Sequence, residues 1–406
     1  MTKTQRAGDR MKIKNIKVIV TSPGRNYVTV KIETDQGLYG IGDATLNGRE
    51  LSVAKALEEY LAPLLIGQDP DNIEYIWQYL YKGAYWRGGP VLMTALAGID
   101  MALWDLKGKS YGIPVYSLLG GKSRNKVLCY THVSGQDLKG VKEKALEKIA
   151  EGYKALRVQV SIPGLTGTYG TVEDDARKSP FVETWDSKSY LKIVPELFEY
   201  LRSEIGDEVQ LIHDSHERLQ VPEAIKLAKE LEKYDLLFLE DLLKPENKDG
   251  FKQIRNQTST PLAMGELFNT KWDALPLIKD QLIDYIRCDL SHIGGITEAM
   301  KIAALAETFH IKTAWHGPAD ISPIAHLANL HVDYAITNFG IQELAGFPEE
   351  VAEVFKGGTE FKNGYLTIPD RPGLGCDIDE EAAAHYPYQR AYLPVAESLD
   401  GSVHEW

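Results

Sequence analysis

The pattern of hydrophobic and polar positions divides the chain into two parts that differ in the order and spacing of their predicted strands and helices. The first part, up to about residue 120, begins with the period-two alternation typical of half-buried strands and then changes to helical spacing. An Asp-Gln-Gly turn at 35–37 joins the second and third strand patterns as a hairpin. Strands are predicted at 12–20, 27–33 and 38–42, and helices at 51–61 and 91–107. The sequence therefore predicts an α+β domain over residues 11–125, preceded by a disordered polar leader at 1–10.

The second part repeats a short apolar run followed by a longer amphipathic helix pattern. Eight runs lie at 127–132, 155–160, 209–216, 236–241, 261–266, 285–290, 313–316 and 338–343. Eight β-then-α units over roughly 220 residues fit a TIM barrel, which typically has about 250 residues. A doubly wound open sheet is the structural alternative, but no GxGxxG follows a first strand. We predict an α/β barrel over residues 126–371, followed by a segment, 372–406, that runs back over another part of the protein.

Composition and charge narrow the possible functions. The chain has 406 residues, 44% of them hydrophobic, which is typical of a folded protein. Its 45 Lys and Arg against 58 Asp and Glu give a net charge of −13, which argues against nucleic-acid binding. Three cysteines, Cys129, Cys288 and Cys376, form no CxxC motif and favour a reducing, cytoplasmic setting. No apolar run approaches the roughly 20 residues of a membrane span.

Ionisable residues stand at the end of almost every predicted strand of the second part. In a TIM barrel the carboxyl ends of the strands form the rim that carries the active site. A single acid there is often only the N-cap of the next helix, but convergence of the whole set is harder to explain by capping. In chain order these rim residues are His132, Arg157, Gln159, Asp214, His216, Glu240, Glu266, Arg287, Asp289, His316 and Glu343.

Three of the rim acids, Asp214, Glu240 and Glu266, end three successive strands. Carboxylates brought together at one rim repel each other, so a hard divalent cation is the natural neutraliser. A set of oxygen ligands favours Mg²⁺ over Zn²⁺. Three independent salt bridges are the alternative. The sequence therefore predicts a Mg²⁺ site that could also offset the negative charge of the protein toward an anionic substrate.

Candidate acid–base residues lie beside this predicted metal site. His216 follows Asp214 by two residues, so both side chains point the same way from one strand, whereas His213 faces outward and is predicted to be packed or hydrogen-bonded. Arg157 stays protonated and cannot be a base. A glycine-rich loop at 164–170 could fold Tyr169 back over the rim, where a guanidinium would lower the pKa of its phenol. A loop tyrosine that only caps the barrel mouth fits the sequence equally well.

Several long strings resemble the enolase superfamily, of the mandelate racemase/muconate lactonizing enzyme type. Within it they resemble the D-mannonate dehydratase subgroup, which includes bacterial starvation-sensing proteins and D-galactonate dehydratase family members. The strings are GDATLNGRE (42–50), YKGAYWRGGP (81–90), DMALWDLKGK (100–109), LLGGKSR (118–124), KALRVQ (154–159), HDSHERL (213–219), LED (239–241), MGELFN (264–269), DYIRCDLSHIGGIT (284–297), WHGPADISP (315–323) and NFGIQE (338–343). The resemblance covers nearly the whole chain from Met11.

The resemblance implies a (β/α)₇β barrel with a capping domain built from the N-terminal segment and the C-terminal tail. It implies Mg²⁺ at Asp214, Glu240 and Glu266, with Tyr169, assisted by Arg157, as the base and His216 as the acid. It also implies a homo-oligomer. The implied substrate contacts are Asn47, His132, Glu266, Arg287, His316, Asp320, Glu343 and Trp406.

The implied activity is dehydration of D-mannonate to 2-dehydro-3-deoxy-D-gluconate and water. Pro318, where efficient members of the subgroup tend to have Ala, predicts low efficiency and D-gluconate as a second substrate. Glu217, where a second His is common, and an apparently shorter stretch between Tyr169 and Asp214 are further departures. The alternatives are a sugar-acid binding or signalling protein with little turnover, and a dehydratase of another acid sugar.

Overall fold

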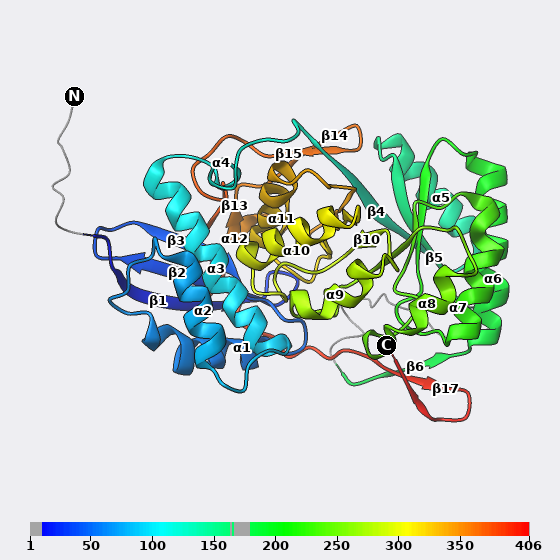
Figure 1. Ribbon diagram of the computed structural model, residues 1–406, viewed down its shortest axis with the longest axis horizontal. Helices are drawn as coiled ribbons and strands as arrows, with labels where there is room; N and C mark the ends of the chain where they lie inside the picture. Colours follow the sequence, from blue (N-terminus) through cyan, green and yellow to red (C-terminus); the bar gives the residue numbers. More distant parts are fainter. Residues whose placement is uncertain (1–9, 163–164, 166–178, 406) are drawn as a thin grey trace.

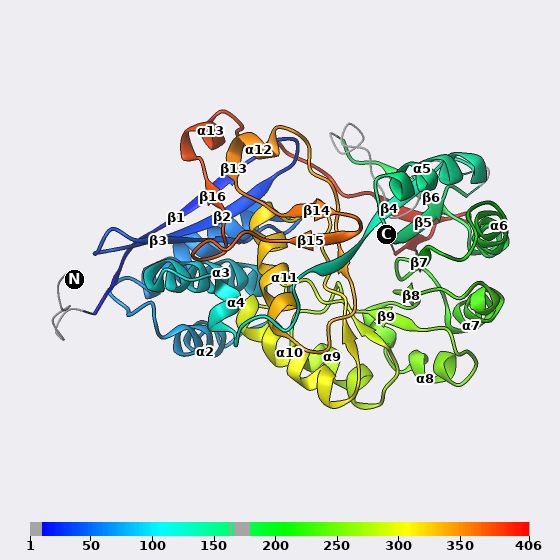
Figure 2. The same cartoon turned by 90° about the horizontal axis from the view of Figure 1, so that it is seen from above.

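A computed structural model describes residues 10–162, 165 and 179–405 of the chain. Figures 1 and 2 show the N-terminal strands and helices at one end of the molecule and a set of strands surrounded by helices at the other. Orange and red segments from the end of the chain lie along both parts. Among the described helices, none is long and apolar enough to cross a membrane.

The N-terminal part is a three-stranded antiparallel sheet covered by helices. β1 (Ile13–Thr21), β2 (Tyr27–Thr34) and β3 (Tyr39–Asp43) pair in chain order, which confirms the three predicted strands. The helices are α1 (Glu50–Ala56), α2 (Ile73–Gly83), α3 (Pro90–Tyr111) and α4 (Val115–Leu118). The helix predicted at 51–61 is α1 continued by a π-helical turn at Leu57–Leu61, and α2 was not predicted. A Cβ on Gly42 would lie 2.0 Å from the carbonyl oxygen of Gly98, so glycine permits α3 to approach β3 this closely.

Among the described residues of the second part, eight strands form one run of parallel pairs, and one lies within or overlaps each of the eight predicted runs. They are β4 (Val127–Gly135), β5 (Ala155–Val160), β7 (Gln210–Asp214), β8 (Phe238–Glu240), β9 (Leu262–Met264), β10 (Tyr285–Ile286), β11 (Lys312–Thr313) and β12 (Gln342–Glu343). Pairing follows chain order from β4 to β11, and β12 pairs with β4. In the described part of the chain, β11 is connected to the segment that leads into β12 by one isolated parallel bridge, between Thr313 and Phe339, and not by a continuous ladder.

Helices follow the parallel strands, as the alternating pattern predicts. They are α5 (Leu138–Ala150), α6 (Ser187–Ile205), α7 (Val221–Leu231), α8 (Gly250–Arg255), α9 (Lys271–Lys279), α10 (Ile296–Thr308) and α11 (Pro323–Ala335). The helices cover the outer faces of the strands (Figure 2). Apolar residues from both kinds of element form one large buried cluster, whereas the inward-facing side chains of Tyr130, Phe238 and Tyr285 belong to a smaller one. This packing leaves the carboxyl ends of the strands for polar residues.

The C-terminal segment contacts both parts of the molecule. α12 (Val351–Val354) leads to β13 (Phe355–Lys356), β14 (Glu360–Lys362), β15 (Tyr365–Thr367), β16 (Asp377–Ile378) and α13 (Glu380–Ala384). Glu380 forms ion pairs with Lys17 and Lys31 of the N-terminal sheet. Further on, β17 (Val395–Ser398) pairs in parallel with β6 (Val182–Trp185), a strand that was not predicted, and antiparallel with β18 (Val403–His404). The boundaries at residues 125 and 371 stay predictions.

Three buried aspartates of the N-terminal part accept hydrogen bonds from the rest of the chain. Asp43 accepts from the hydroxyl of Ser291 at 2.9 Å and from the amide of Ser322 at 3.2 Å. Asp100 accepts from the amide of Thr297 at 2.9 Å, at the start of α10. Asp105 accepts from the amides of Ile41 and Leu374, at 2.9 and 2.8 Å. Asp43 and Asp100 therefore attach the N-terminal part to the segments that follow β10 and β11, and Asp105 attaches it to the C-terminal segment.

A buried histidine at the junction of the two parts predicts a loss of stability in acid. His331 accepts from the amide of Tyr116 at 3.1 Å and is bonded to the carbonyl of Leu374 at 3.1 Å, and burial lowers its pKa to about 4. The unfolded chain, with an ordinary histidine pKa of about 6.5, binds a proton that the folded chain excludes. The free energy of unfolding should therefore fall as the pH drops from about 6.5 to 4, by about 3 kcal/mol from this residue.

The measurement is urea unfolding at pH 7.0 and 4.5 for the natural chain, His331→Asn and His310→Asn. His310 is exposed and serves as the matched control. We expect His331→Asn to be less stable at pH 7.0 and to lose less stability on acidification, while His310→Asn follows the natural chain. Equal pH dependence in all three proteins would contradict the assignment.

Candidate active site

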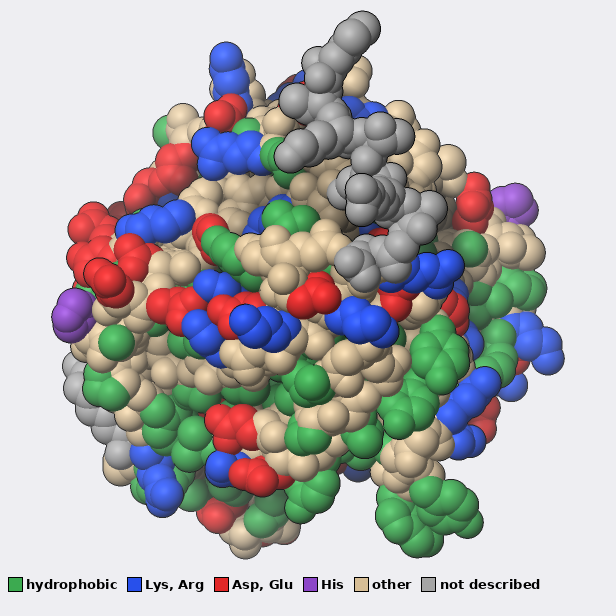
Figure 3. Space-filling model, turned by 90° about the vertical axis from the view of Figure 1, so that its left-hand side faces the viewer, with side chains coloured by type: hydrophobic (Ala, Val, Ile, Leu, Met, Phe, Trp, Pro, Cys, Tyr) green, Lys and Arg blue, Asp and Glu red, His purple; other side chains and the backbone are tan. Residues whose placement is uncertain are grey.

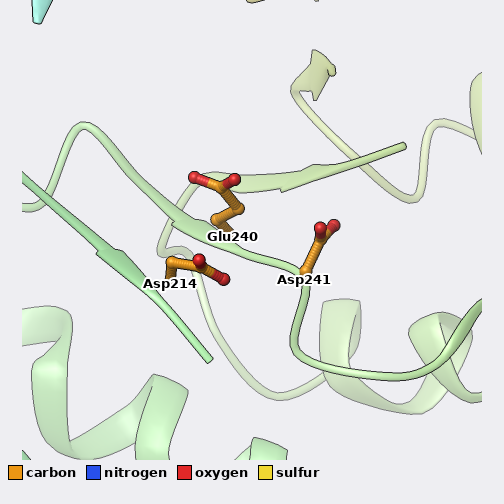
Figure 4. A group of neighbouring side chains, drawn as sticks. All are labelled: Asp214, Glu240 and Asp241. Carbon is orange, nitrogen blue, oxygen red and sulfur yellow. The ribbon is translucent and has the colours of Figure 1, made fainter. Parts of the chain in front are cut away.

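The ends of β7 and β8 bring together a group of buried carboxylates. Asp214 is the last residue of β7 and Glu240 the last of β8, and Asp241 follows directly. All three are buried, and their oxygens include one set that lies within 4.8 Å of one another (Figure 4). Among the described residues, no donor bonds Oε2 of Glu240 or Oδ2 of Asp241. Buried carboxylate oxygens that lack donors and face one another are suited to holding a hard cation.

Glu266 is not one of the three residues whose oxygens lie within 4.8 Å of one another, although its charge acts on Asp241. The carboxylate of Glu266 is 3.9 Å from Nε2 of His216 and 3.5 Å from Nε2 of His316. Asp241, which was not among the predicted metal ligands, is the third member of the group, and its Oδ1 accepts from the amide of Gly265 at 3.3 Å. The structure therefore brings two of the three predicted metal ligands together and places the third beside both histidines.

Two buried arginines lie between the carboxylates. Arg157, on β5, contacts Oδ2 of Asp214 at 3.0 Å and Oε1 of Glu240 at 3.8 Å. Arg287, which follows β10, contacts Glu240 at 2.6 Å and Glu343 at 2.9 Å. Burial raises the pKa of Glu240 to about 8 despite these guanidinium groups, whereas the pKa of Asp214 is lowered, because Arg157, His216 and Arg287 together outweigh its burial. Three buried carboxyl groups, Asp214, Glu240 and Glu343, thus share two arginines.

Tyr130 also belongs to this network and was missed by sequence reasoning. Its hydroxyl accepts a hydrogen bond from Nη1 of Arg287 at 2.5 Å. Tyr130 precedes His132 by two residues on β4, so the alternation of side chains along a strand could have placed both on the same face. His132 itself is hydrogen-bonded to Glu343, and burial together with the neighbouring Arg157 lowers its pKa.

The two histidines that flank Glu266 differ in their surroundings. His216 has a left-handed backbone (φ 51°), and its amide donates to Oδ1 of Asp214 at 2.7 Å. Nδ1 of His316 lies 2.9 Å from Asp289. Burial alone would lower the pKa of His316, but the carboxylates of Glu266, Glu343 and Asp289 raise it to about 9. A protonated imidazole therefore stands opposite His216 at neutral pH.

The remaining predicted residues lie where the two parts of the chain meet, in the packed interior, or outside the described residues. Asn47, from the loop after β3, is hydrogen-bonded to Asp320, which follows β11 and is also ion-paired with Arg25. His213 is hydrogen-bonded to Tyr190 at 2.8 Å and Val158 at 2.9 Å, which confirms that it is a packed histidine rather than a site residue. Tyr169 and Trp406 lie outside the described residues.

Comparison with known proteins defines the class. Residues 140–382 match the family described as Enolase C-terminal domain-like, and residues 1–120 match the N-terminal domain of mandelate racemase / muconate lactonizing enzyme. The chain belongs to the enolase superfamily, whose fold combines an N-terminal cap with a C-terminal barrel.

Individual relatives make the class more specific. The chain is 51% identical to the D-galactonate dehydratase family member RspA of Cellvibrio japonicus and 50% identical to a D-mannonate dehydratase of Caulobacter vibrioides, covering 98% of this chain and 100% of each relative. The crystal structure of an enolase from Pantoea ananatis with bound D-gluconate and Mg superposes with a TM-score of 0.91 at 45% identity, covering 98% of this chain and 100% of that one. These relatives confirm the predicted family and its dehydratase class.

The predicted ligand set of Asp214, Glu240 and Glu266 and the geometric group, in which Asp241 replaces Glu266, can be distinguished by Mg²⁺ binding. We expect Asp214→Asn, Glu240→Gln and Glu266→Gln each to weaken Mg²⁺ binding more than Asp241→Asn. Asp241 already accepts from Gly265, and a residue that only orients ligands typically contributes about 10- to 100-fold in affinity. Calorimetric titration of metal-free protein with MgCl₂ measures this. A larger loss in Asp241→Asn than in Glu266→Gln would assign the third ligand to Asp241.

Proposed function

We propose that this protein is a Mg²⁺-dependent acid-sugar dehydratase that converts D-mannonate to 2-dehydro-3-deoxy-D-gluconate and water, with low efficiency and with D-gluconate as a second substrate. The observation that carries the proposal is the buried rim group in which Asp214 and Glu240 lie against Arg157 and Arg287. The names of the relatives at about 50% identity support the same reaction class.

The binding part of the proposal rests on charge. In it, Asp214, Glu240 and Glu266 hold Mg²⁺, which when bound supplies Lewis-acid stabilisation to the negative charge that develops on the substrate carboxylate. Arg287 and a protonated His316 supply further positive charge on the same side of the rim. Asn47, His132, Asp320, Glu343 and Trp406 complete the proposed sugar contacts.

The chemical part of the proposal divides proton transfer between two residues. Tyr169, with its phenol pKa lowered by Arg157, removes the proton on C2 of the substrate. His216 gives a proton to the hydroxyl on C3, which leaves as water while the C2–C3 double bond forms. The resulting enol becomes the 2-keto product by taking a proton at C3. His216 is suited to the acid role because it lies beside Glu266 at the rim and its backbone is fixed by Asp214.

The second candidate function is a sugar-acid binding protein with little turnover. Pro318 favours it, because this residue follows the rim residue His316 and its carbonyl oxygen accepts a hydrogen bond from His326 at 2.9 Å. That bond and the proline ring together fix the backbone next to the proposed substrate site. A site that binds the sugar acid but holds it in one unproductive position would behave in this way.

A screen of a stereochemically complete set of acid sugars with Mg²⁺, detecting the 2-keto product, tests the dehydratase. We expect turnover of D-mannonate and slower turnover of D-gluconate, both abolished by EDTA. Product from a different sugar would change the substrate. No product from any member, with binding of D-mannonate retained in calorimetry, would favour the binding protein.

The roles of the two proton-transfer residues are tested separately by isotope exchange. We expect Tyr169→Phe to abolish exchange of the C2 proton with solvent deuterium, because the base is lost, while Mg²⁺ binding is unchanged. We expect His216→Asn to abolish dehydration, by at least about 100-fold, but to retain exchange at C2. Unchanged exchange in Tyr169→Phe would remove Tyr169 from the base role.

A further inference from the structure

The loop that carries His216, residues 215–218, has an unusual backbone. His216 and Glu217 are successive left-handed residues, with φ of 51° and 65°, a conformation that non-glycine residues rarely adopt. The amide of Ser215 donates to the carbonyl of Glu240 at 3.0 Å, and that of Glu217 to the carbonyl of Asp241 at 2.6 Å. These bonds attach one edge of the loop to the end of β8. A strained loop of this kind keeps its shape only when its surroundings fix it from several sides.

Arg218 fixes the outer side of the loop. Its side chain is 1% exposed, and Nη2 lies 3.3 Å from Oε2 of Glu183 on β6. The guanidinium carbon is also 5.0 Å from the centre of the Trp185 ring on the same strand. A carboxylate and an indole face together define both the position and the orientation of the guanidinium group that contacts them. The loop of His216 is thereby attached to β6.

β6 belongs to a small sheet that contains the end of the chain. β17 pairs with β6 from Val395 opposite Val182 to Ser398 opposite Trp185, and β18 completes a three-stranded sheet. The ring of His404, on β18, lies 5.9 Å from Trp185, and the side chain of Lys244 contacts Glu405 at 2.7 Å. Figure 1 shows β6 and β17 side by side below the strands of the second part. Arg218 therefore provides a direct contact between this sheet and the His216 loop.

We propose that Arg218 is a positioning residue that, through Glu183 and Trp185, fixes His216 in the orientation needed to protonate the leaving hydroxyl, an inference that rests on the proposed dehydratase function. A buried ion pair contributes little net stability compared with apolar packing of the same volume. Its directional hydrogen bonding nevertheless defines one geometry, which is what an acid next to a reacting oxygen requires. The C-terminal sheet thus contributes to the acid side of the site through Arg218.

This role predicts a separation of the two chemical steps. In Arg218→Gln and Glu183→Gln, His216 is displaced, whereas the proposed base, Tyr169, belongs to a different segment of the chain. We expect kcat for dehydration to fall by about 10- to 100-fold, the size of effect that a misplacement of about 1 Å produces. We expect exchange of the C2 proton with solvent deuterium to change by less than about threefold, because formation of the intermediate does not use His216. Arg218→Lys keeps the charge but not the fork, and should restore only part of kcat.

Arg255→Gln is the matched control. Arg255 is ion-paired with Asp284, which precedes β10 and so lies at the opposite end of the strands from His216. We expect this variant to keep both dehydration and exchange. A parallel loss of exchange and dehydration in Arg218→Gln and Glu183→Gln, or no loss of either, would overturn the positioning role.

A second measurement does not depend on activity. Proton–carbon spectra of protein labelled at the histidine rings, with His216 assigned by its absence in His216→Asn, report the surroundings of that imidazole directly. We expect Arg218→Gln and Glu183→Gln to shift the His216 resonance and Arg255→Gln to leave it in place. An unshifted His216 resonance in both Arg218→Gln and Glu183→Gln would overturn the inference, even if the protein dehydrates no acid sugar. A dehydratase screen without product would overturn only the proposed function.

Discussion

The structure depends on the balance of buried charge where the strands end. Arg157 and Arg287 are each shared among carboxylates that come from different strands, so removing one charge would leave others buried and unpaired. Their hydrogen bonds span the rim from β5 to β12 and tie together strands as short as two residues. Burial raises the pKa of Glu240 even beside the two guanidinium groups, so these groups alone do not fully stabilise its ionised form or complete the balance. A divalent cation is the group whose charge and oxygen preference would complete it.

The same balance resolves the difficulty that the overall composition raises. A net charge of −13 disfavours an anionic substrate when it is considered as an average over the surface. At the rim, however, several of the acids are buried and paired with arginine or histidine, so their negative charge is largely offset within the protein. The buried aspartates of the N-terminal part likewise accept backbone amides within the protein. The sign of the whole protein therefore says little about the sign of its pocket.

Sequence reasoning located the parallel strands from local information, although it missed α2. The eight apolar runs each contain or overlap a strand because burial between helices requires continuous apolar residues, and the rim acids follow from where those runs end. Sequence reasoning failed for elements whose conformation depends on contacts with distant parts of the chain. β6 exists through its pairing with β17, some 200 residues later in the chain, and has no strong pattern of its own. Asp241 enters the carboxylate group through a left-handed turn (φ 44°), which alternation along a strand does not foresee.

The two ends of the C-terminal segment explain why a long tail without strong periodicity is nevertheless ordered. Glu380 and its neighbours bind the N-terminal sheet, so that they hold the cap from its outer side. The final strands bind β6 and, through Trp185, the guanidinium of Arg218. The first contact therefore attaches the tail to β1 and β2, and the second attaches it through β6 to the loop of His216. A segment without strong periodicity is thus ordered by two separate sets of tertiary contacts.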